Sequence, residues 1–311
     1  MKIRKNFRGF YWCDHLRTYE FDEINFKSKI ILYFGNPKLK FLDKLSKRKK
    51  VYVDFEEPNR LAFYSSSSKN LDLWKGGNYD CQFDKIFSIC PYTSEWFNDL
   101  NNNKKREAIF HPTNENLIYK KNNLKKDIDV IYTGNIHGLK KDILATMLEP
   151  ITKFNYRIVS SFGDNKMVTD KNISNEKKFE LIARSKISVI HQLLFPDRNL
   201  IEKFLKIKDI RKNKAFEHID DGIIPQMKSR PFEAAWSKTL ILIKKDPFNV
   251  IENYFEPNKH FLYFEEHELE KKIKYIINNY EDFRHITGAA YTHVKENYSR
   301  TKFLEKVSLS S

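Results

Sequence analysis

The hydrophobic positions of this chain form short apolar runs that alternate with segments of mixed polarity. In the first hundred residues the apolar runs are "KIILYFG" from residue 29, "VYVDF" and "FDKIFSIC". They are rich in β-branched and aromatic residues and short, which predicts buried strands, whereas a segment such as "YTSEWFNDL" has helical spacing. Strands that alternate with helices predict a parallel sheet covered on both faces.

The alternation stops once and then restarts. The polar stretch "TNENLIYKKNNLKK" at residues 113–126 predicts a connection between two domains, and later strands are expected at "DVIYTG", "YRIVSSFG", "KISVIHQ" and "TLILI". Residues 193–226 show no clear pattern. The predicted fold class is α/β, with two Rossmann-like doubly wound domains that face each other across a cleft. Residues 1–122 form the first domain, residues 123–285 form the second, and residues 286–311 form a helix that packs back on the first domain.

Composition and charge bound the function classes. The 311 residues include three widely spaced cysteines and no Cys-x-x-Cys pair, which fits a reducing cytoplasm better than a disulfide framework. The amino-terminal "MKIRKNFRGFYW" lacks the apolar run of a signal peptide, and no segment approaches the ~20 apolar residues of a membrane helix. We therefore expect a cytoplasmic protein, either soluble or peripheral at the inner membrane face.

The formal charge of +15 favours anionic partners, which include nucleic acid, lipid headgroups and phosphorylated metabolites. A solvated basic surface explains the same charge equally well. The runs "KRKK" at residues 47–50 and "KKR" at residues 104–106 are best interpreted as solvated ends of helices or loops. Contact with an anionic membrane is their alternative. Nucleic acid is the less favoured partner because the sequence contains no helix-turn-helix or related motif.

Two stretches carry candidate binding chemistry. In "VIYTGNIHGLKKDIL" a strand ends at Gly134 and a helix is expected near Leu139, so the turn permits close backbone approach and exposes helix amides to an anion. Two glycines after a strand are more often only a turn, and the spacing does not match a dinucleotide fingerprint. Asn135 and His137 lie in the same turn.

The second stretch is "MKSRPFEAAWSKTLIL", which places Lys228 and Arg230 directly before Pro231 at an expected helix start. A cation at the amino end of a helix is disfavoured by up to ~1 kcal/mol, so an anionic ligand in front of the helix would explain both residues. Glu233 would fall in the first turn, where a carboxylate can cap backbone amides. It could also accept hydrogen bonds from ribose hydroxyls.

These stretches, in their order, resemble the second domain of glycosyltransferases of the two-Rossmann-domain (GT-B) type. The similar segments are "IFHPTNE", "DVIYTGNIHG", "ARSKISVI", "SRPFEAAWSKTLILIKKDPF", "YFEPNKHFLYFEEHELEKKIKYIINN" and "AAYTHVKENYS". Within that class the sequence is most similar to the glycosyl transferase group 1, or spore-maturation-protein-like (CgeB-like), proteins. The resemblance covers roughly residues 110–303 with good order and spacing, and the first hundred residues only loosely.

The resemblance implies a donor domain at residues 123–285 and an acceptor domain at residues 1–122. It implies Gly134 and Asn135 near the donor diphosphate, Arg230 on a phosphate and Glu233 near the ribose. We add His137 and Lys228 to these nucleotide-sugar-binding candidates. Three positions depart from the family pattern. Pro225 stands where retaining enzymes often have a glutamate, and Lys238 and Asn258 stand where glycines are common.

The catalytic candidates lie in the first half of the chain. Asp14, His15 and Glu57 could serve as the general base that an inverting transferase needs on the acceptor hydroxyl. A solvated turn is the stronger alternative for Glu57, which precedes Pro58, and Asp14 and His15 could equally be ordinary loop or core groups. No His/Asp/Glu cluster has metal-ligand spacing, and we find no sugar-nucleotide Asp-x-Asp metal motif of the kind that single-Rossmann transferases carry. We therefore expect no metal and no other cofactor.

The function predicted from the sequence is transfer of a hexosyl or related sugar from a nucleotide-diphosphate sugar to a hydroxyl of a glycan or lipid-linked saccharide, as in polysaccharide biosynthesis. Two alternatives stay open. One is a sugar-nucleotide epimerase of the same fold, which would consume the donor without an acceptor. The other is a basic nucleic-acid-binding protein, which would show steep salt dependence.

Overall fold

The chain forms two compact units in the computed structural model, which describes residues 30–34, 49–59, 61, 83–102, 105–113, 115–118, 124–136, 141–161 and 165–309. Unit 1 comprises Met1–Pro112, Leu193–Met227 and Arg300–Ser311, and unit 2 comprises Thr113–Gln192 and Lys228–Ser299. This division differs from the predicted boundaries at residues 122 and 285. The first segment ends ten residues earlier, and unit 1 also includes the poorly patterned segment and the last helix.

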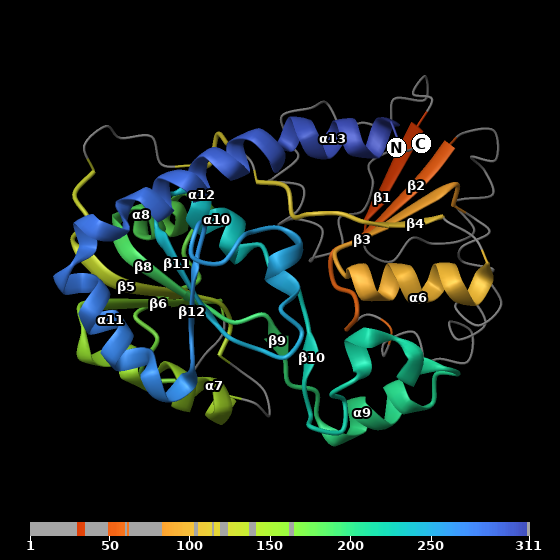
Figure 1. Cartoon of the computed structure of the whole chain (residues 1–311), viewed down its shortest axis with the longest axis horizontal. Coiled ribbons are helices and arrows are strands. Elements are labelled where there is room, and N and C mark those ends of the chain that lie inside the picture. The colour runs from red at the N-terminus through yellow and green to blue at the C-terminus, as the bar shows by residue number, and fades with distance from the viewer. Residues whose placement is uncertain are drawn as a thin grey trace. The chain divides into compact units, whose positions relative to one another are not determined.

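Unit 1 contains a four-stranded parallel sheet in the order β1-β2-β3-β4 (Figure 1). The three strands predicted in this half are present, and β4 is a fourth. Their bounds are Ile30–Phe34 for β1, Lys49–Asp54 for β2, Lys85–Ser88 for β3 and Arg106–Ala108 for β4. Helix α6 (Pro91–Asn101) connects β3 to β4, and it begins at a proline whose fixed φ suits the first helical position. Its Trp96 and Phe97 are buried.

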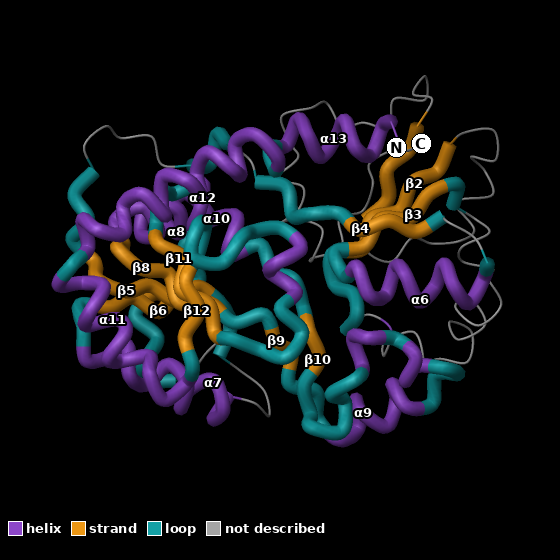
Figure 2. The backbone as a smooth tube through the Cα atoms, viewed as in Figure 1, coloured by secondary structure: helices purple, strands orange, loops and turns teal. Residues whose placement is uncertain are grey.

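The segment from Leu193 to Met227 contains elements that the sequence pattern did not reveal (Figure 2). They are the antiparallel pair β9 (Leu193–Leu194) and β10 (Ile224–Pro225), helix α9 (Arg198–Leu205), and the 3-10 turns η3 (Ile210–Lys212) and η4 (Lys214–Phe216). Asp197 caps α9 by accepting from the Leu200 amide at 2.8 Å. The Trp96 indole of α6 donates to the Asp209 carbonyl oxygen at 3.1 Å, which fixes this segment to unit 1.

Helix α13 (Arg300–Leu309) also belongs to unit 1. Phe303 is fully buried, and the centroid of its ring lies 6.0 Å from that of Phe55 and 5.9 Å from that of Phe110. Lys306 Nζ donates to the Ala108 carbonyl oxygen at 2.8 Å. The predicted carboxy-terminal helix is therefore two helices. The first of them, α12 (Arg284–Asn297), is part of unit 2.

Unit 2 is built on a six-stranded parallel sheet in the order β12-β11-β8-β5-β6-β7. The strands are β5 (Ile128–Thr133), β6 (Tyr156–Ser160), β7 (Asp170–Lys171), β8 (Ser185–Ile190), β11 (Leu240–Lys244) and β12 (Leu262–Phe264). Only the short β7 and β12 lie outside the predicted strands. Their two or three residues are too few to show a periodic pattern.

Helices cover both faces of this sheet (Figure 1). On one face α10 contacts both α8 and α12, and on the other face α11 and α7 contact η2. The bounds are Lys141–Leu148 for α7, Glu149–Lys153 for η2, Asn175–Arg184 for α8, Arg230–Trp236 for α10 and Leu269–Asn278 for α11. The prediction of a parallel sheet covered on both faces is confirmed for unit 2.

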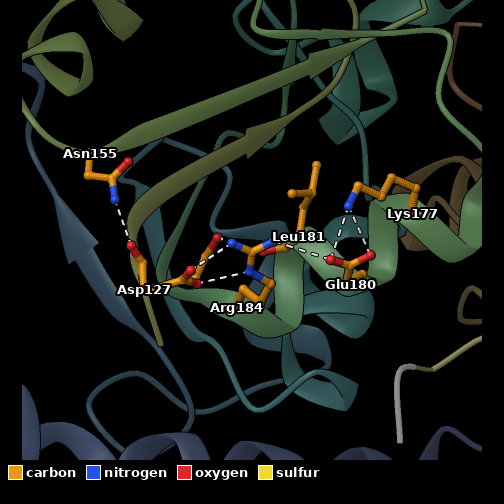
Figure 3. A network of polar contacts seen from close by, with 7 residues as sticks. Asp127, Asn155, Lys177, Glu180, Leu181 and Arg184 are labelled. Carbon is orange, nitrogen blue, oxygen red and sulfur yellow. Dashed lines mark hydrogen bonds and ion pairs between the residues drawn. The ribbon is translucent and has the colours of Figure 1, made fainter. Parts of the chain in front are cut away.

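The amino-terminal edge of this sheet is held by an ion-pair network (Figure 3). Arg184, at the end of α8, donates to both carboxylate oxygens of Asp127 at 2.9 and 2.6 Å and to Glu180 at 3.2 Å. Asn155 Nδ2 donates to the Asp127 carbonyl oxygen at 2.6 Å. Such a network ties α8 to the start of β5 and leaves the opposite edge of the sheet for loops that bind ligands.

The strand order defines a topological switch point between β5 and β8. From β5 the chain moves to β6 and β7 on one side, and then returns to β8, β11 and β12 on the other side. In open α/β sheets, ligands bind at the carboxyl ends of the strands beside such a point. We therefore expect a ligand-binding site in the loops that follow β5 and β8. Among the described residues, no helix has the length and apolar character to span a membrane.

Candidate functional site

The candidate site lies at the carboxyl ends of β5 and β8, and it includes Gly134. Gly134 directly follows β5, has φ +153°, and its amide donates to the Val159 carbonyl oxygen at 2.8 Å. A β-carbon built at this position would come within 1.8 Å of Arg230 Nη2. The backbone conformation therefore favours glycine here, and an added β-carbon would displace the end of the Arg230 side chain.

Arg230 extends from the start of α10 across the end of β5. Its Nη1 donates to the Tyr132 hydroxyl at 3.1 Å, and its guanidinium carbon lies 4.9 Å from the centre of the Tyr132 ring. Tyr132 is fully buried, so it fixes the guanidinium while Arg230 itself keeps exposed surface. Since α10 has only seven residues, the case for an anion here rests on these side chains rather than on the end of the helix.

Lys228 lies at the same edge of the sheet, beside the residues that follow β8. Its backbone amide donates to Gln192 Oε1 at 3.0 Å, and its Nζ lies 3.2 Å from His191 Nδ1. Burial lowers the pKa of Lys228 well below its ordinary value, and the nearby Arg230 lowers it further, whereas Asp246 acts in the opposite direction. The structure therefore brings Gly134, Lys228 and Arg230 to the same edge of the sheet.

Glu233 takes a position that limits its predicted contact with a ribose. Its side chain is only 2% exposed, and Oε1 lies 3.1 Å from Lys178 Nζ. This ion pair links α10 to α8. The α10 helix starts at Arg230, one residue before the proline, and the Ser229 side chain forms no capping hydrogen bond.

Asn135 is next to Gly134 and shapes the turn. Its Oδ1 accepts from the Ser161 amide at 2.9 Å and from the Ser160 hydroxyl at 3.4 Å, which joins the ends of β5 and β6. The third residue predicted in this turn, His137, lies outside the described residues.

Of the three catalytic candidates, only Glu57 falls in the described part of the chain, and Asp14 and His15 lie outside it. The Glu57 side chain is fully buried in unit 1, and Oε1 lies 3.0 Å from Arg106 Nη1. Burial raises the pKa of Glu57 to about 7, although Arg106 lowers it. A carboxylate without exposed surface and with an arginine partner suits a structural ion pair. The burial of Glu57 contradicts the solvated turn expected at this position, and its role as a general base stays a prediction.

Two of the departures from the family pattern have a common backbone cause. Lys238 has φ +51° and Asn258 has φ +63°, so both positions are left-handed. Glycine is common at such positions because it has no β-carbon to clash. The departures therefore preserve the backbone and change only the side chain. Pro225 lies in β10 of unit 1.

Sequence reasoning missed three residues of the site: Tyr132, His191 and Gln192. All three are nearly or fully buried, and they lie at the ends of the runs "DVIYTG" and "KISVIHQ". Polar side chains at the end of an apolar parallel strand were the available signal, since the carboxyl ends of such strands face the ligand. Among the described residues, no group of three His, Cys, Asp or Glu side chains is arranged to hold a metal ion.

The two units, each with a parallel sheet, define an α/β architecture of two Rossmann-like units. The sequence profile of the glycosyl transferase-like family matches residues 140–307, and the chain belongs to this family. No curated protein matches the sequence.

Solved structures support the same fold. Anabaena Alr3699/HepE, determined in complex with UDP-glucose, has a TM-score of 0.60 and 11% identity, and the match covers 90% of this chain and 78% of that chain. Sucrose-phosphate synthase from Thermosynechococcus elongatus has a TM-score of 0.57 and 11% identity, over 92% of this chain and 73% of that one. A glycosyltransferase from Rickettsia africae has a TM-score of 0.54 and 13% identity, over 100% and 83%. At these identities the likeness concerns the fold, and it confirms the predicted GT-B class.

Proposed function

We propose that this protein transfers a sugar from a nucleoside-diphosphate sugar to a hydroxyl acceptor, and that the donor diphosphate binds at the carboxyl ends of β5 and β8. The observation that carries the proposal is the position of the Arg230 guanidinium, held over Gly134 by Tyr132 beside the topological switch point. Arginine suits a diphosphate because its planar fork of donors matches two phosphate oxygens.

The nature of the donor is supported by proteins of similar fold. Alr3699/HepE was determined with UDP-glucose, and the pneumococcal O-GlcNAc transferase GtfA, with a TM-score of 0.51 and 8% identity, was determined with UDP and GlcNAc. We therefore propose UDP as the first nucleotide to test. A hexosyl group is the proposed cargo, and a glycan or lipid-linked saccharide is the proposed acceptor. Membership in the spore-maturation-protein-like group also stays a prediction.

In the proposed reaction, protein side chains stabilise the negative charge that develops on the departing nucleotide. Departure of the nucleotide leaves negative charge on the β-phosphate, and preorganised cations at that position lower the barrier. Arg230 supplies a permanent positive charge, and Lys228 lies on the same edge. We propose that these two residues serve in place of a metal ion, in a protein that acts in the cytoplasm, either soluble or peripheral at the inner membrane face.

Binding of UDP to the Arg230→Ala variant tests the site. Loss of a bidentate phosphate contact should weaken UDP binding at least tenfold, because hydrogen bonds to charged groups contribute about 1.5–3 kcal/mol each. Arg284→Ala is the matched control, since Arg284 belongs to the same unit and its side chain is 69% exposed. If no common nucleoside diphosphate binds the wild-type protein at millimolar concentration by isothermal titration calorimetry or NMR, the proposal is wrong.

The two remaining alternatives give different results with the same protein. An epimerase would convert the donor sugar without any acceptor. A nucleic-acid-binding protein would bind oligonucleotides with an affinity that falls steeply with salt, and Arg230→Ala would change that affinity no more than Arg284→Ala.

A further inference from the structure

Four polar side chains at the candidate site form a continuous hydrogen-bonded chain. Arg230 Nη1 lies 3.1 Å from the Tyr132 hydroxyl, and that hydroxyl lies 3.2 Å from His191 Nε2. His191 Nδ1 in turn lies 3.2 Å from Lys228 Nζ. The Tyr132 and His191 rings are nearly parallel, with 6° between their planes, and both side chains are buried. The chain thus connects the two cations of the site through one imidazole.

The order of donors along this chain depends on the charge of Lys228. Arginine can only donate, so the Tyr132 oxygen accepts from Arg230. If the Tyr132 hydroxyl donates to Nε2, the neutral imidazole carries its proton on Nδ1. That proton must then be donated to Lys228 Nζ, which has a lone pair only as a neutral amine.

A second arrangement holds one more proton. As an ammonium, Lys228 donates to Nδ1, and the imidazole then carries its proton on Nε2 and donates it to the Tyr132 oxygen. The Tyr132 hydroxyl proton no longer points at His191 in this state. The two arrangements therefore differ by one proton on Lys228 Nζ and by the tautomer of His191.

The charges that face Lys228 select between these states. Arg230 of α10 disfavours the ammonium, and Asp246, which follows β11, favours it. One oxygen of the Asp246 carboxylate, Oδ1, accepts hydrogen bonds from the Phe248 and Asn249 amides at 2.9 and 3.1 Å. Burial raises the pKa of Asp246, whereas Lys228 and Lys244 lower it. In the empty site, burial and Arg230 both lower the pKa of Lys228 and so act against the ammonium form.

We infer that binding of a nucleoside diphosphate takes up one proton from solvent at Lys228, and that His191 is the positioning residue that accommodates it by moving its own proton from Nδ1 to Nε2. This inference rests on the proposed function, because it requires a diphosphate beside Arg230. The incoming negative charge offsets the repulsion by Arg230 and makes the ammonium the favoured form. Lys228 then becomes a second cation on the ligand only when the ligand is present.

Isothermal titration calorimetry of UDP binding at pH 8 tests this, in phosphate and in Tris buffer. UDP itself is fully ionised there, so a difference in apparent enthalpy between the buffers reports protons taken up by the protein. We expect proton uptake on UDP binding by the wild-type protein, and a UDP affinity that falls as the pH rises above 8. In Lys228→Met the uptake should vanish and the affinity should become independent of pH.

The role of His191 has its own measurement. His191→Leu removes the acceptor for the ammonium, and hydrogen bonds of charged groups are stronger than those of neutral groups, so UDP affinity at pH 8 should fall by roughly tenfold. The loss should be smaller at pH 6.5, whereas a merely structural role would give the same loss at both pH values. Thermal unfolding of each variant checks that it folds, and Arg284→Ala should match the wild type throughout. UDP binding without proton uptake overturns this inference alone, and absence of UDP binding overturns the proposed function.

Discussion

The guanidinium of Arg230 lies against the backbone of Gly134, so close that a β-carbon at Gly134 would come within 1.8 Å of Nη2 and 2.3 Å of Cζ. Neither residue is near the other in sequence, and each is only weakly informative alone. Tyr132 holds the guanidinium by a hydrogen bond and a ring contact. The three residues thus place a positive charge beside the Gly134 backbone, at the carboxyl ends of parallel strands.

Gly134→Ala should displace Arg230 and weaken UDP binding at least tenfold. The added methyl group clashes with the guanidinium, and the backbone at φ +153° is strained for any residue with a β-carbon. Titration calorimetry with UDP measures the affinity, and denaturant unfolding measures the accompanying loss of stability. Wild-type affinity in this variant would show that the guanidinium is not needed where it lies.

Gly288→Ala is the matched control and carries a prediction of the opposite sign. Gly288 lies in α12, is exposed, and an added β-carbon would meet no atom within 4 Å. Alanine in place of glycine inside a helix should raise the free energy of unfolding by about 0.5–1 kcal/mol. Chemical denaturation checks this, and UDP affinity should stay unchanged. A fall in stability would contradict the open surroundings of this position.

The parts of the site that the sequence revealed are those fixed by local chemistry. Gly134 and Arg230 stand out because a glycine after a strand and a cation at a helix start each break a local rule. His191 does not stand out, because one histidine at the end of a strand has many ordinary explanations. Its place in the site is evident only from its contacts with Tyr132 and Lys228, which are 59 and 37 residues away in sequence.

The same limit applies to the fold. The six-stranded sheet of unit 2 was largely predictable because its central strands are continuous apolar runs. Helix α9 was not, since it has eight residues, is rich in charge, and has Phe204 as its only fully buried side chain. The burial of Glu57 was not predicted because its partner, Arg106, lies 49 residues away in sequence, in a run that looks solvated. Pairings over such distances depend on tertiary structure.

The ion pair between Glu57 and Arg106 should make the stability of the protein depend on pH. Burial raises the pKa of Glu57 from 4.5 to about 7. The folded carboxyl then holds its proton more tightly than the unfolded chain does. Its contribution to stability is therefore fully present below about pH 4.5 and is lost as the pH rises through about 7. In Arg106→Met the carboxylate loses its partner, so we expect a loss of about 3–5 kcal/mol at pH 8 and a smaller loss at pH 5.

Denaturant unfolding at the two pH values measures this effect. The double variant Glu57→Gln/Arg106→Met removes both charges and should recover most of the stability, since replacing a buried pair by uncharged groups is often nearly neutral. An equal loss of stability at pH 5 and pH 8 for Arg106→Met would contradict the assignment.

The Glu57→Gln variant distinguishes a structural role of this carboxyl group from a catalytic one. A general base would lose 10²–10⁴-fold in turnover on this change, whereas a buried structural carboxyl should keep turnover within about tenfold.

Lys238 should be the more strained of the two left-handed positions at which the sequence resemblance leads us to expect glycine. Its φ is +51°, and its carbonyl oxygen accepts from Lys126 Nζ at 2.7 Å, so the turn is anchored whatever side chain it carries. The Lys238 ammonium lies 4.5 Å from the centre of the Tyr291 ring, a contact that any truncation removes. Lys238→Gly and Lys238→Ala both lose that contact, and only glycine relieves the backbone. We expect the glycine variant to be more stable than the alanine variant by about 1 kcal/mol in chemical denaturation.

Asn258 provides the comparison for this effect. Its φ is +63°, but asparagine enters the left-handed region more readily than lysine does. Asn258→Gly should therefore raise stability by only a few tenths of a kcal/mol over the wild type. Asn258→Ala should lower it by about 1 kcal/mol, since alanine has neither the freedom of glycine nor the polar side chain of asparagine. If the alanine variants are as stable as the glycine variants or more stable at both positions, backbone strain does not determine which residue is stable there.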